Sequence, residues 1–164
     1  MRKLLYILCV FCLLSCERPT RFSGDALEET FLNWNGEEVT FQEIMNQYEG
    51  SKVLIDIWAS WCKDCIVTLS QLKTLQKNNP EVKYVFLSLD KTPKSWKQGV
   101  ERFQIEGEHY FMQGGKKGAF GDFLNVWWIP RYVVLNEKGE ITLYKATKIT
   151  DKNIVEALNL NDAK

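Results

Sequence analysis

The sequence predicts an α/β fold, a three-layer sandwich in which helices cover a central mixed β-sheet. Residues 52–58 and 82–89 form near-continuous apolar runs, which are typical of strands buried on both faces of a sheet. A helical pattern over residues 62–78 separates these two runs. The strand–helix–strand order predicts a parallel pair of strands, and a later hairpin and helix complete the layers.

The remaining elements follow from local signals along the chain. Asn35-Gly36 lies between two strand-like runs and predicts an N-terminal β-hairpin. Thr40 and Glu43 have the spacing of a capping box, which predicts the start of a helix. In chain order we expect strands over 30–34, 37–40, 52–58, 82–89, 110–111, 131–136 and 140–144, and helices over 41–48, 62–78, 92–104, 116–124 and 151–158.

The composition excludes several classes of protein. The 164 residues include 21 Lys and Arg against 21 Asp and Glu. The chain therefore lacks the basic excess of a dedicated nucleic-acid binder, and we expect no nucleic-acid partner. Apolar residues make up 45% of the chain, which is enough for one packed domain and argues against disorder. Five cysteines are few for a scaffold held together by disulfides.

The N-terminus has the features of an export signal. Arg2 and Lys3 precede an apolar run over residues 4–14, which suits the core of a signal peptide and is shorter than the roughly 20 residues that cross a bilayer. The following residues 13–16 (LLSC) resemble the bacterial lipobox, in which the cysteine carries lipid and becomes the first mature residue. The alternative is a plain signal peptide followed by an incidental cysteine at Cys16.

These features divide the chain into three parts. We expect a lipoprotein signal peptide over 1–15, a lipidated Cys16 that opens a tether over 16–26, and a folded domain over 27–164. Such a protein would be anchored to a membrane of the bacterial cell envelope without spanning it and would face the periplasm. We expect the domain to be a monomer.

Only Cys62 and Cys65 remain in the domain after such processing. A disulfide across a two-residue gap closes too short a loop to add much stability, whereas export to an oxidising compartment favours redox chemistry. Half of a zinc site is an alternative, but zinc is usually held by four ligands and the processed chain adds only His109, so we expect no metal. An inert buried pair is a second alternative.

Cys62 opens the helix that follows the first buried strand. Free N–H groups and the helix dipole at that end favour an anion, so the pKa of the Cys62 thiol should be lowered. Cys65, one turn further on, could then attack a mixed disulfide on Cys62. Lys63 should favour the Cys62 thiolate and Asp64 should oppose it, so their net effect on the redox potential stays open.

Asp56 is the one charged residue in the apolar stretch 53–59. Burial in such a strand should raise the pKa of its carboxyl into a range that is useful for proton transfer. A hydrogen-bonded acid without a catalytic role is the alternative.

Two segments together resemble the thioredoxin family. Residues 53–65 (VLIDIWASWCKDC) look like its active-site strand and turn, and Trp128-Ile129-Pro130 looks like its cis-proline loop. The 64 residues between Cys65 and Pro130 exceed the spacing of a minimal thioredoxin. The excess matches the extra strand-helix insert before the cis-proline loop of TlpA/ResA-type exported thiol-disulfide oxidoreductases.

The resemblance, which covers about residues 27–160, implies a thioredoxin-like sandwich and a protein-disulfide reductase. Cys62 matches the nucleophile, Cys65 the resolving cysteine and Asp56 the buried acid that assists proton transfer. The implied partners are protein thiols or disulfides and an upstream thiol electron donor. No cofactor is implied beyond the redox-active cysteine pair.

The substrate-binding residues that the resemblance implies are Trp61, Ile129 and Pro130. A cis bond before Pro130 would leave the backbone of Ile129 free to pair with an extended substrate peptide. Trp127 and Trp128 could form an apolar rim beside this loop or contribute to the core. His109 is interpreted as a strand-edge residue rather than a general base.

The sequence also departs from the family. Asp64 stands where the family usually has proline, and Thr68 stands where relatives often have glutamate. A disulfide-forming oxidase and a membrane-tethered binding module without turnover therefore remain alternatives to the reductase. A peroxidase of the related fold is disfavoured, because the residues directly before Cys62 include neither the proline nor the threonine expected ahead of a peroxidatic cysteine.

Overall fold

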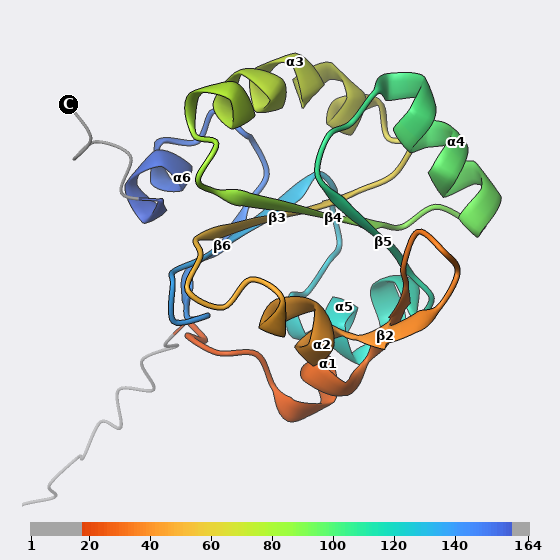
Figure 1. Cartoon of the computed structure of the whole chain (residues 1–164), viewed down its shortest axis with the longest axis horizontal. Helices are drawn as coiled ribbons and strands as arrows, with labels where there is room; N and C mark the ends of the chain where they lie inside the picture. The colour runs from red at the N-terminus through yellow and green to blue at the C-terminus, as the bar shows by residue number, and fades with distance from the viewer. Residues whose placement is uncertain (1–17, 159–164) are drawn as a thin grey trace, which may run out of the picture.

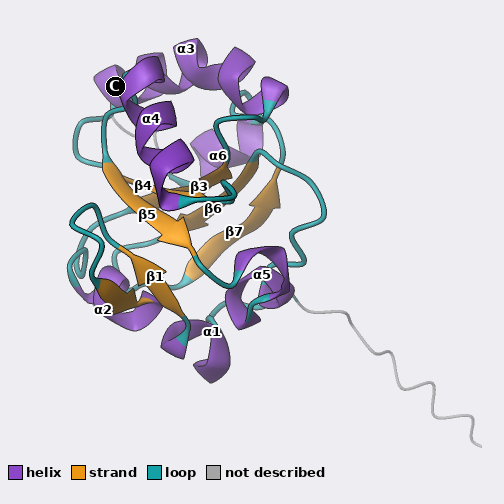
Figure 2. Cartoon of the chain, turned by 90° about the vertical axis from the view of Figure 1, so that its right-hand side faces the viewer, coloured by secondary structure: helices purple, strands orange, loops and turns teal. Residues whose placement is uncertain are grey.

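In the computed structural model, which describes residues 18–158, a seven-stranded mixed sheet separates two layers of helices. The elements are α1 (Gly24–Glu28), β1 (Thr30–Leu32), β2 (Glu38–Thr40), α2 (Phe41–Asn46), β3 (Val53–Trp58), α3 (Lys63–Asn78), β4 (Lys83–Ser88), α4 (Pro93–Phe103), β5 (Glu108–Met112), η1 (Gly115–Lys117), α5 (Ala119–Phe123), β6 (Arg131–Leu135), β7 (Ile141–Ala146) and α6 (Lys152–Ala157). The strands lie in the order β2-β1-β5-β4-β3-β6-β7. Figures 1 and 2 show α3 and α4 over one face and α1, α2 and α5 over the other, which confirms the predicted three-layer fold.

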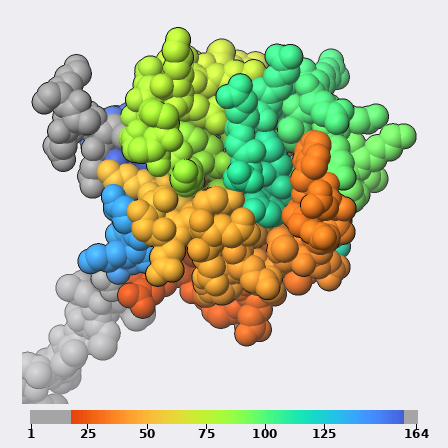
Figure 3. Space-filling view, viewed as in Figure 1, coloured from red at the N-terminus to blue at the C-terminus, as the bar shows by residue number. Residues whose placement is uncertain are grey.

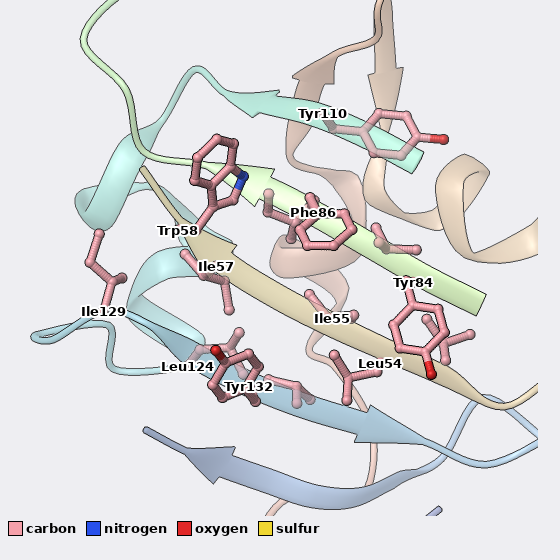
Figure 4. Packing of buried hydrophobic residues seen from close by; sticks show 14 of the residues in the cluster. Leu54, Ile55, Ile57, Trp58, Tyr84, Phe86, Tyr110, Leu124, Ile129 and Tyr132 are labelled. Atoms are coloured by element: carbon pink, nitrogen blue, oxygen red, sulfur yellow. The ribbon is translucent and has the colours of Figure 1, made fainter. Parts of the chain in front are cut away.

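Strand β3 carries the chain into the predicted site. It pairs parallel with β4 and antiparallel with β6, and all six of its residues are buried. Because β3 and β4 run parallel, α3 must return along the sheet between them, so α3 begins near the carboxyl end of β3. Figure 4 shows side chains of β3 packed in the core, with Ile55 and Ile57 on the face of the sheet opposite to that of Phe86 and Tyr132.

The N-terminal hairpin completes the far side of the sheet. Strands β1 and β2 pair antiparallel, as predicted, around a turn in which Gly36 has a φ of 85°. Strand β1 also pairs with β5, and Figure 3 shows the orange hairpin packed beside the green α4–β5 region. Strand β5 with η1 and α5 precedes the loop at Pro130, where the resemblance implied a strand-helix insert.

The packed structure reaches further toward the N-terminus than the expected boundary at residue 26. The ring of Phe22 lies 4.7 Å from that of Phe41 and 5.7 Å from that of Phe120, measured between centroids. The N–H of Ile141 donates to the carbonyl of Thr20 at 2.8 Å. Residues 20–26 therefore contribute to the domain, whereas the predicted signal peptide and Cys16 lie outside the described residues.

One helix expected over 116–124 is instead two short helices, η1 and α5. Gly118 between them has extended backbone, with φ −67° and ψ 163°. The carboxylate of Glu29 accepts a hydrogen bond from the N–H of Phe120 at 2.6 Å, and a side chain on Gly118 would collide with this carboxylate. Contact with Glu29 from a distant part of the chain thus ends one helix and starts the next.

The turn between β3 and α3 is fixed from two sides. Ser60 donates to the Asp90 carboxylate through its N–H at 3.0 Å and through its hydroxyl at 2.6 Å. Ser88, at the end of β4, donates to the same carboxylate at 2.8 Å. On the other side α4 approaches so closely that a Cβ on Gly99 would lie 2.5 Å from the Cβ of Ser60. These contacts hold the backbone that precedes Cys62.

Candidate active site

The two cysteines lie at the start of α3 and form a disulfide, with their Cα atoms 5.3 Å apart. Cys62 is the N-cap residue, and its sulfur accepts a hydrogen bond from the N–H of Cys65 at 3.1 Å. Both side chains are buried, with 6% of Cys62 and 2% of Cys65 exposed. After reduction, the helix N–H groups would stabilise a thiolate on Cys62, because negative charge is favoured at a helix N-terminus.

The loop before β6 reaches the same sulfur. The carbonyl oxygen of Ile129 lies 3.6 Å from the Cys62 sulfur, and the Ile129–Pro130 bond is cis. Trp61 is exposed beside them. A hollow of about 310 Å³ opens next to the sulfur and is lined by Trp61, Cys62, Lys63, Asp64, Lys116, Trp127, Trp128 and Ile129. The structure therefore brings Trp61, Ile129 and Pro130 to the disulfide.

Asp56 is buried in β3, between aromatic neighbours. It lies directly opposite Phe86 of β4 and Tyr132 of β6, so the three side chains share one face of the sheet. The side chain is 3% exposed, and its Oδ1 atom has no hydrogen-bond partner among residues 18–158. Burial raises the pKa of the Asp56 carboxyl to about 8, which is the direction that an apolar strand predicts.

Two hydroxyl groups lie between this strand pair and the second cysteine. The Tyr132 hydroxyl is 3.3 Å from the Thr68 hydroxyl, which also donates to the carbonyl of Cys65 at 2.9 Å. Burial and the nearby Asp56 carboxyl both raise the pKa of Tyr132, so its hydroxyl stays protonated. Sequence reasoning missed Tyr132 because its position depends on the pairing of β3 with β6. Tyr132 follows Pro130 by two residues, and in extended chain this spacing puts both side chains on the same face. That spacing was the one local sign of the position of Tyr132.

Lys63 and Asp64, the residues between the cysteines, are both exposed. Water therefore screens the opposing effects that their charges have on Cys62.

His109 lies away from the disulfide. It is in β5, opposite Phe86, and its ring stacks on that of Phe86 with centroids 4.9 Å apart. Its Nε2 atom is 2.9 Å from the carbonyl oxygen of Ile105, and burial lowers the pKa of the imidazole to about 4. At His109 strand β5 pairs with β4, whereas its pairing with β1 involves Phe111 and Met112, so His109 lies at a strand edge as expected.

Two further observations concern residues 18–158. Within this range, no three side chains of His, Cys, Asp or Glu are grouped so that they could hold a metal ion. The same residues include no helix that is both long and apolar enough to cross a membrane.

A family model described as thioredoxin-like matches residues 50–141, a range that contains β3, the disulfide and the loop at Pro130. The chain belongs to the thioredoxin-like family. A protein of Bacteroides vulgatus, described as a thiol-disulfide oxidoreductase and solved in solution, has the same architecture. It is 28% identical, with a TM-score of 0.68, and the match covers 85% of this chain and 89% of that one.

Distant relatives place this thioredoxin-like chain with the TlpA/ResA-type proteins. The thioredoxin-like protein YneN of Bacillus subtilis is 28% identical over 131 residues, which are 77% of this chain and 72% of YneN. The thiol-disulfide oxidoreductase ResA of Oceanobacillus iheyensis is 26% identical over 121 residues, 72% of this chain and 62% of ResA. The chain is therefore a thiol-disulfide oxidoreductase, with Cys62 and Cys65 as its redox pair.

We predict that Asp56→Asn stabilises the oxidised protein and that the gain in unfolding free energy grows between about pH 4 and about pH 8. The carboxyl has an ordinary pKa of 3.8 in the unfolded chain but about 8 in the folded protein. As pH rises through this window, the unfolded state releases a proton that the folded state keeps, so the wild type loses stability. When the two states differ by one bound proton, the free energy of unfolding changes by at most about 1.4 kcal/mol per pH unit.

Urea unfolding of both proteins across this pH range measures the effect. Asp25→Asn, which removes an exposed carboxylate in α1, is the control and should show no such trend. A difference between Asp56→Asn and wild type that stays constant with pH, or a variant that is destabilised throughout, would contradict the prediction.

Proposed function

We propose that this thioredoxin-like protein reduces disulfides in protein substrates, with Cys62 as nucleophile and Cys65 as resolving cysteine. The observation that carries the proposal is the position of the Cys62 sulfur, which caps α3 and borders a hollow beside Ile129. At this position the reduced sulfur is favoured as a thiolate, and the hollow gives a substrate sulfur access to it.

Electrons and protons balance in two steps. The Cys62 thiolate attacks the substrate disulfide, a bond forms between Cys62 and one substrate sulfur, and the other substrate sulfur leaves and takes up a proton. Cys65 then loses its proton and attacks the Cys62 sulfur, which releases the second substrate thiol. The substrate gains two electrons and two protons, and an upstream thiol donor must reduce the Cys62–Cys65 disulfide again.

Asp56 is proposed as the group that exchanges protons in the second step. Its raised pKa lets the carboxyl gain or lose a proton near neutral pH, and its neighbour Tyr132 contacts Thr68 beneath Cys65. The Asp56→Asn variant described above should therefore also slow the attack of Cys65 on a mixed disulfide, by about 10²-fold.

We expect the two thiols of the reduced protein to react unequally. Cys62, at the helix N-terminus, should be alkylated before Cys65 at a pH below about 8. Cys62→Ser should abolish turnover, and Cys65→Ser should accumulate mixed disulfides on Cys62. Timed alkylation with peptide mass analysis measures the order. Equal rates, or faster modification of Cys65, would refute the assignment.

The direction of exchange is tested by the redox potential of the pair. A reductase should have a potential near that of thioredoxin, at about −270 mV, whereas an oxidase should lie toward about −120 mV. Equilibration of the Cys62–Cys65 disulfide against glutathione buffers gives the value. A potential at the oxidising end would replace the reductase by a disulfide-forming oxidase.

We also propose that Cys16 carries a lipid that anchors the domain to a membrane of the cell envelope. The support is the LLSC pattern at residues 13–16 after an apolar run. Cys16→Ala should move the protein out of the membrane fraction and leave the disulfide exchange rate unchanged. The matched control is Ser15→Ala, which keeps the cysteine. Unaltered fractionation of Cys16→Ala would exclude the anchor.

A further inference from the structure

Exposed apolar side chains gather around the disulfide. Among residues 18–158, the large hydrophobic side chains that are exposed are Trp34, Trp61, Val67, Trp127 and Trp128. Four of these five border the hollow at Cys62 or the hollow next to it. The exposed fractions of Trp127 and Trp128 are 81% and 59%. Clustered apolar surface of this kind marks an interaction site, whereas a single exposed residue would need no explanation.

A second hollow adjoins the one at Cys62 near the start of α3, and the two together are called the groove below. The second hollow, of about 360 Å³, is lined by Val67, Pro130 and Ile149 among others, and Asp64 and Trp128 border both. Cys62 lines the first hollow, so a partner whose sulfur exchanges with Cys62 must enter that part of the groove.

The loop that carries the two tryptophans is held by its backbone. The guanidinium of Arg131, which is 5% exposed, donates to the carbonyls of Leu124 at 2.8 Å and Asn125 at 3.4 Å. The ammonium of Lys116 donates to the carbonyl of Trp127 at 3.4 Å. The rings are thus presented to solvent by a fixed backbone, which is an arrangement suited to binding.

The charges along the groove are unequal. Lys63, Lys116 and Lys148 line it, with Asp64 as the one carboxylate among its lining residues. An acidic segment is therefore attracted to the groove, and a basic segment is repelled from the Lys116 end.

We propose that this groove selects substrates in which an aromatic residue is next to the reacting cysteine and an acidic residue flanks the pair. The aromatic side chain stacks on Trp127 or Trp128, and the acidic residue approaches Lys116. The proposal rests on the proposed function, because the occupant is the segment that brings its sulfur to Cys62. A membrane or a second copy seated permanently on the groove would block that exchange.

The test uses the reduced mature protein with Cys65→Ser and peptides whose single cysteine is activated as a disulfide with thionitrobenzoate. Attack by Cys62 forms a bond to the peptide sulfur and releases the coloured thiolate, which leaves readily because its pKa is low. Four peptides combine Phe or Ala beside the cysteine with Glu or Lys as the flanking residue. The Phe/Glu peptide should react about 10-fold faster than the Ala/Lys peptide.

Two variants test which residues cause the preference for Phe over Ala and the preference for Glu over Lys. Trp127→Ala should reduce the ratio of the Phe to the Ala rate about fivefold, and Lys116→Glu should reverse the preference for Glu over Lys. Trp34→Ala removes an exposed tryptophan outside the groove, and Lys117→Glu makes the same charge change one residue away. Both controls should leave the two ratios unchanged.

A small uncharged disulfide, hydroxyethyl disulfide, separates the two proposals. If Cys62 reacts with neither this probe nor the peptides, the proposed function fails. If Cys62 reacts with all four peptides equally, or if the controls act like Trp127→Ala, the exchange chemistry stands and the groove proposal is overturned. It is also overturned if Trp127→Ala leaves the peptide ratios unchanged but abolishes a dimer in light scattering or binding to vesicles of anionic phospholipid.

Discussion

The junction between β3 and α3 places the N–H groups of a helix start beside the sulfur of Cys62. Strand β3 cannot shift, since it is buried throughout and paired on both sides. The turn that follows is held to Asp90 through Ser60 and contacted closely by α4 at Gly99. The position of the sulfur is therefore set by the sheet, and the reactivity proposed for Cys62 depends on that position.

The same strand carries a buried carboxyl group whose two cross-strand neighbours are uncharged aromatic residues. Asp56 faces Phe86 and Tyr132, and neither neighbour supplies a positive charge. Burial of a carboxyl in such a place is unfavourable for its ionised form, which is why the pKa of Asp56 rises to about 8. This carboxyl, which makes the fold less stable at high pH, therefore gains and loses its proton near neutral pH, as the proposed proton exchange with Cys65 requires.

Local signals in the sequence were enough to predict the central strand before the disulfide and the N-terminal elements. The apolar run of β3 and the hairpin turn at Gly36 both depend on neighbouring residues, and the structure confirms them. The capping box of Thr40 and Glu43 is also present. These features could be predicted because each one is decided within a few residues of the chain.

The features that sequence reasoning missed all depend on contacts between distant segments. The packing of Phe22 with Phe120 drew the N-terminal residues into the domain, and Glu29 divided an expected helix at Gly118. The contact between Tyr132 and Thr68 requires the register of β3 with β6 and the placement of α3 over that pair. None of these contacts leaves a periodic signal in the chain, so a pattern of local residues could not predict them.

The backbone contacts of Arg131 have a thermodynamic consequence for complex formation. Because the carbonyls of Leu124 and Asn125 are already held, the tryptophan loop has little conformational entropy left to lose when a partner arrives. The ordering cost then falls on the partner segment, and flexible or partly unfolded segments bear most of it. Partners of the same charge that fit the groove should therefore differ from one another mainly in residence time, since a preformed surface leaves their encounter rates nearly the same.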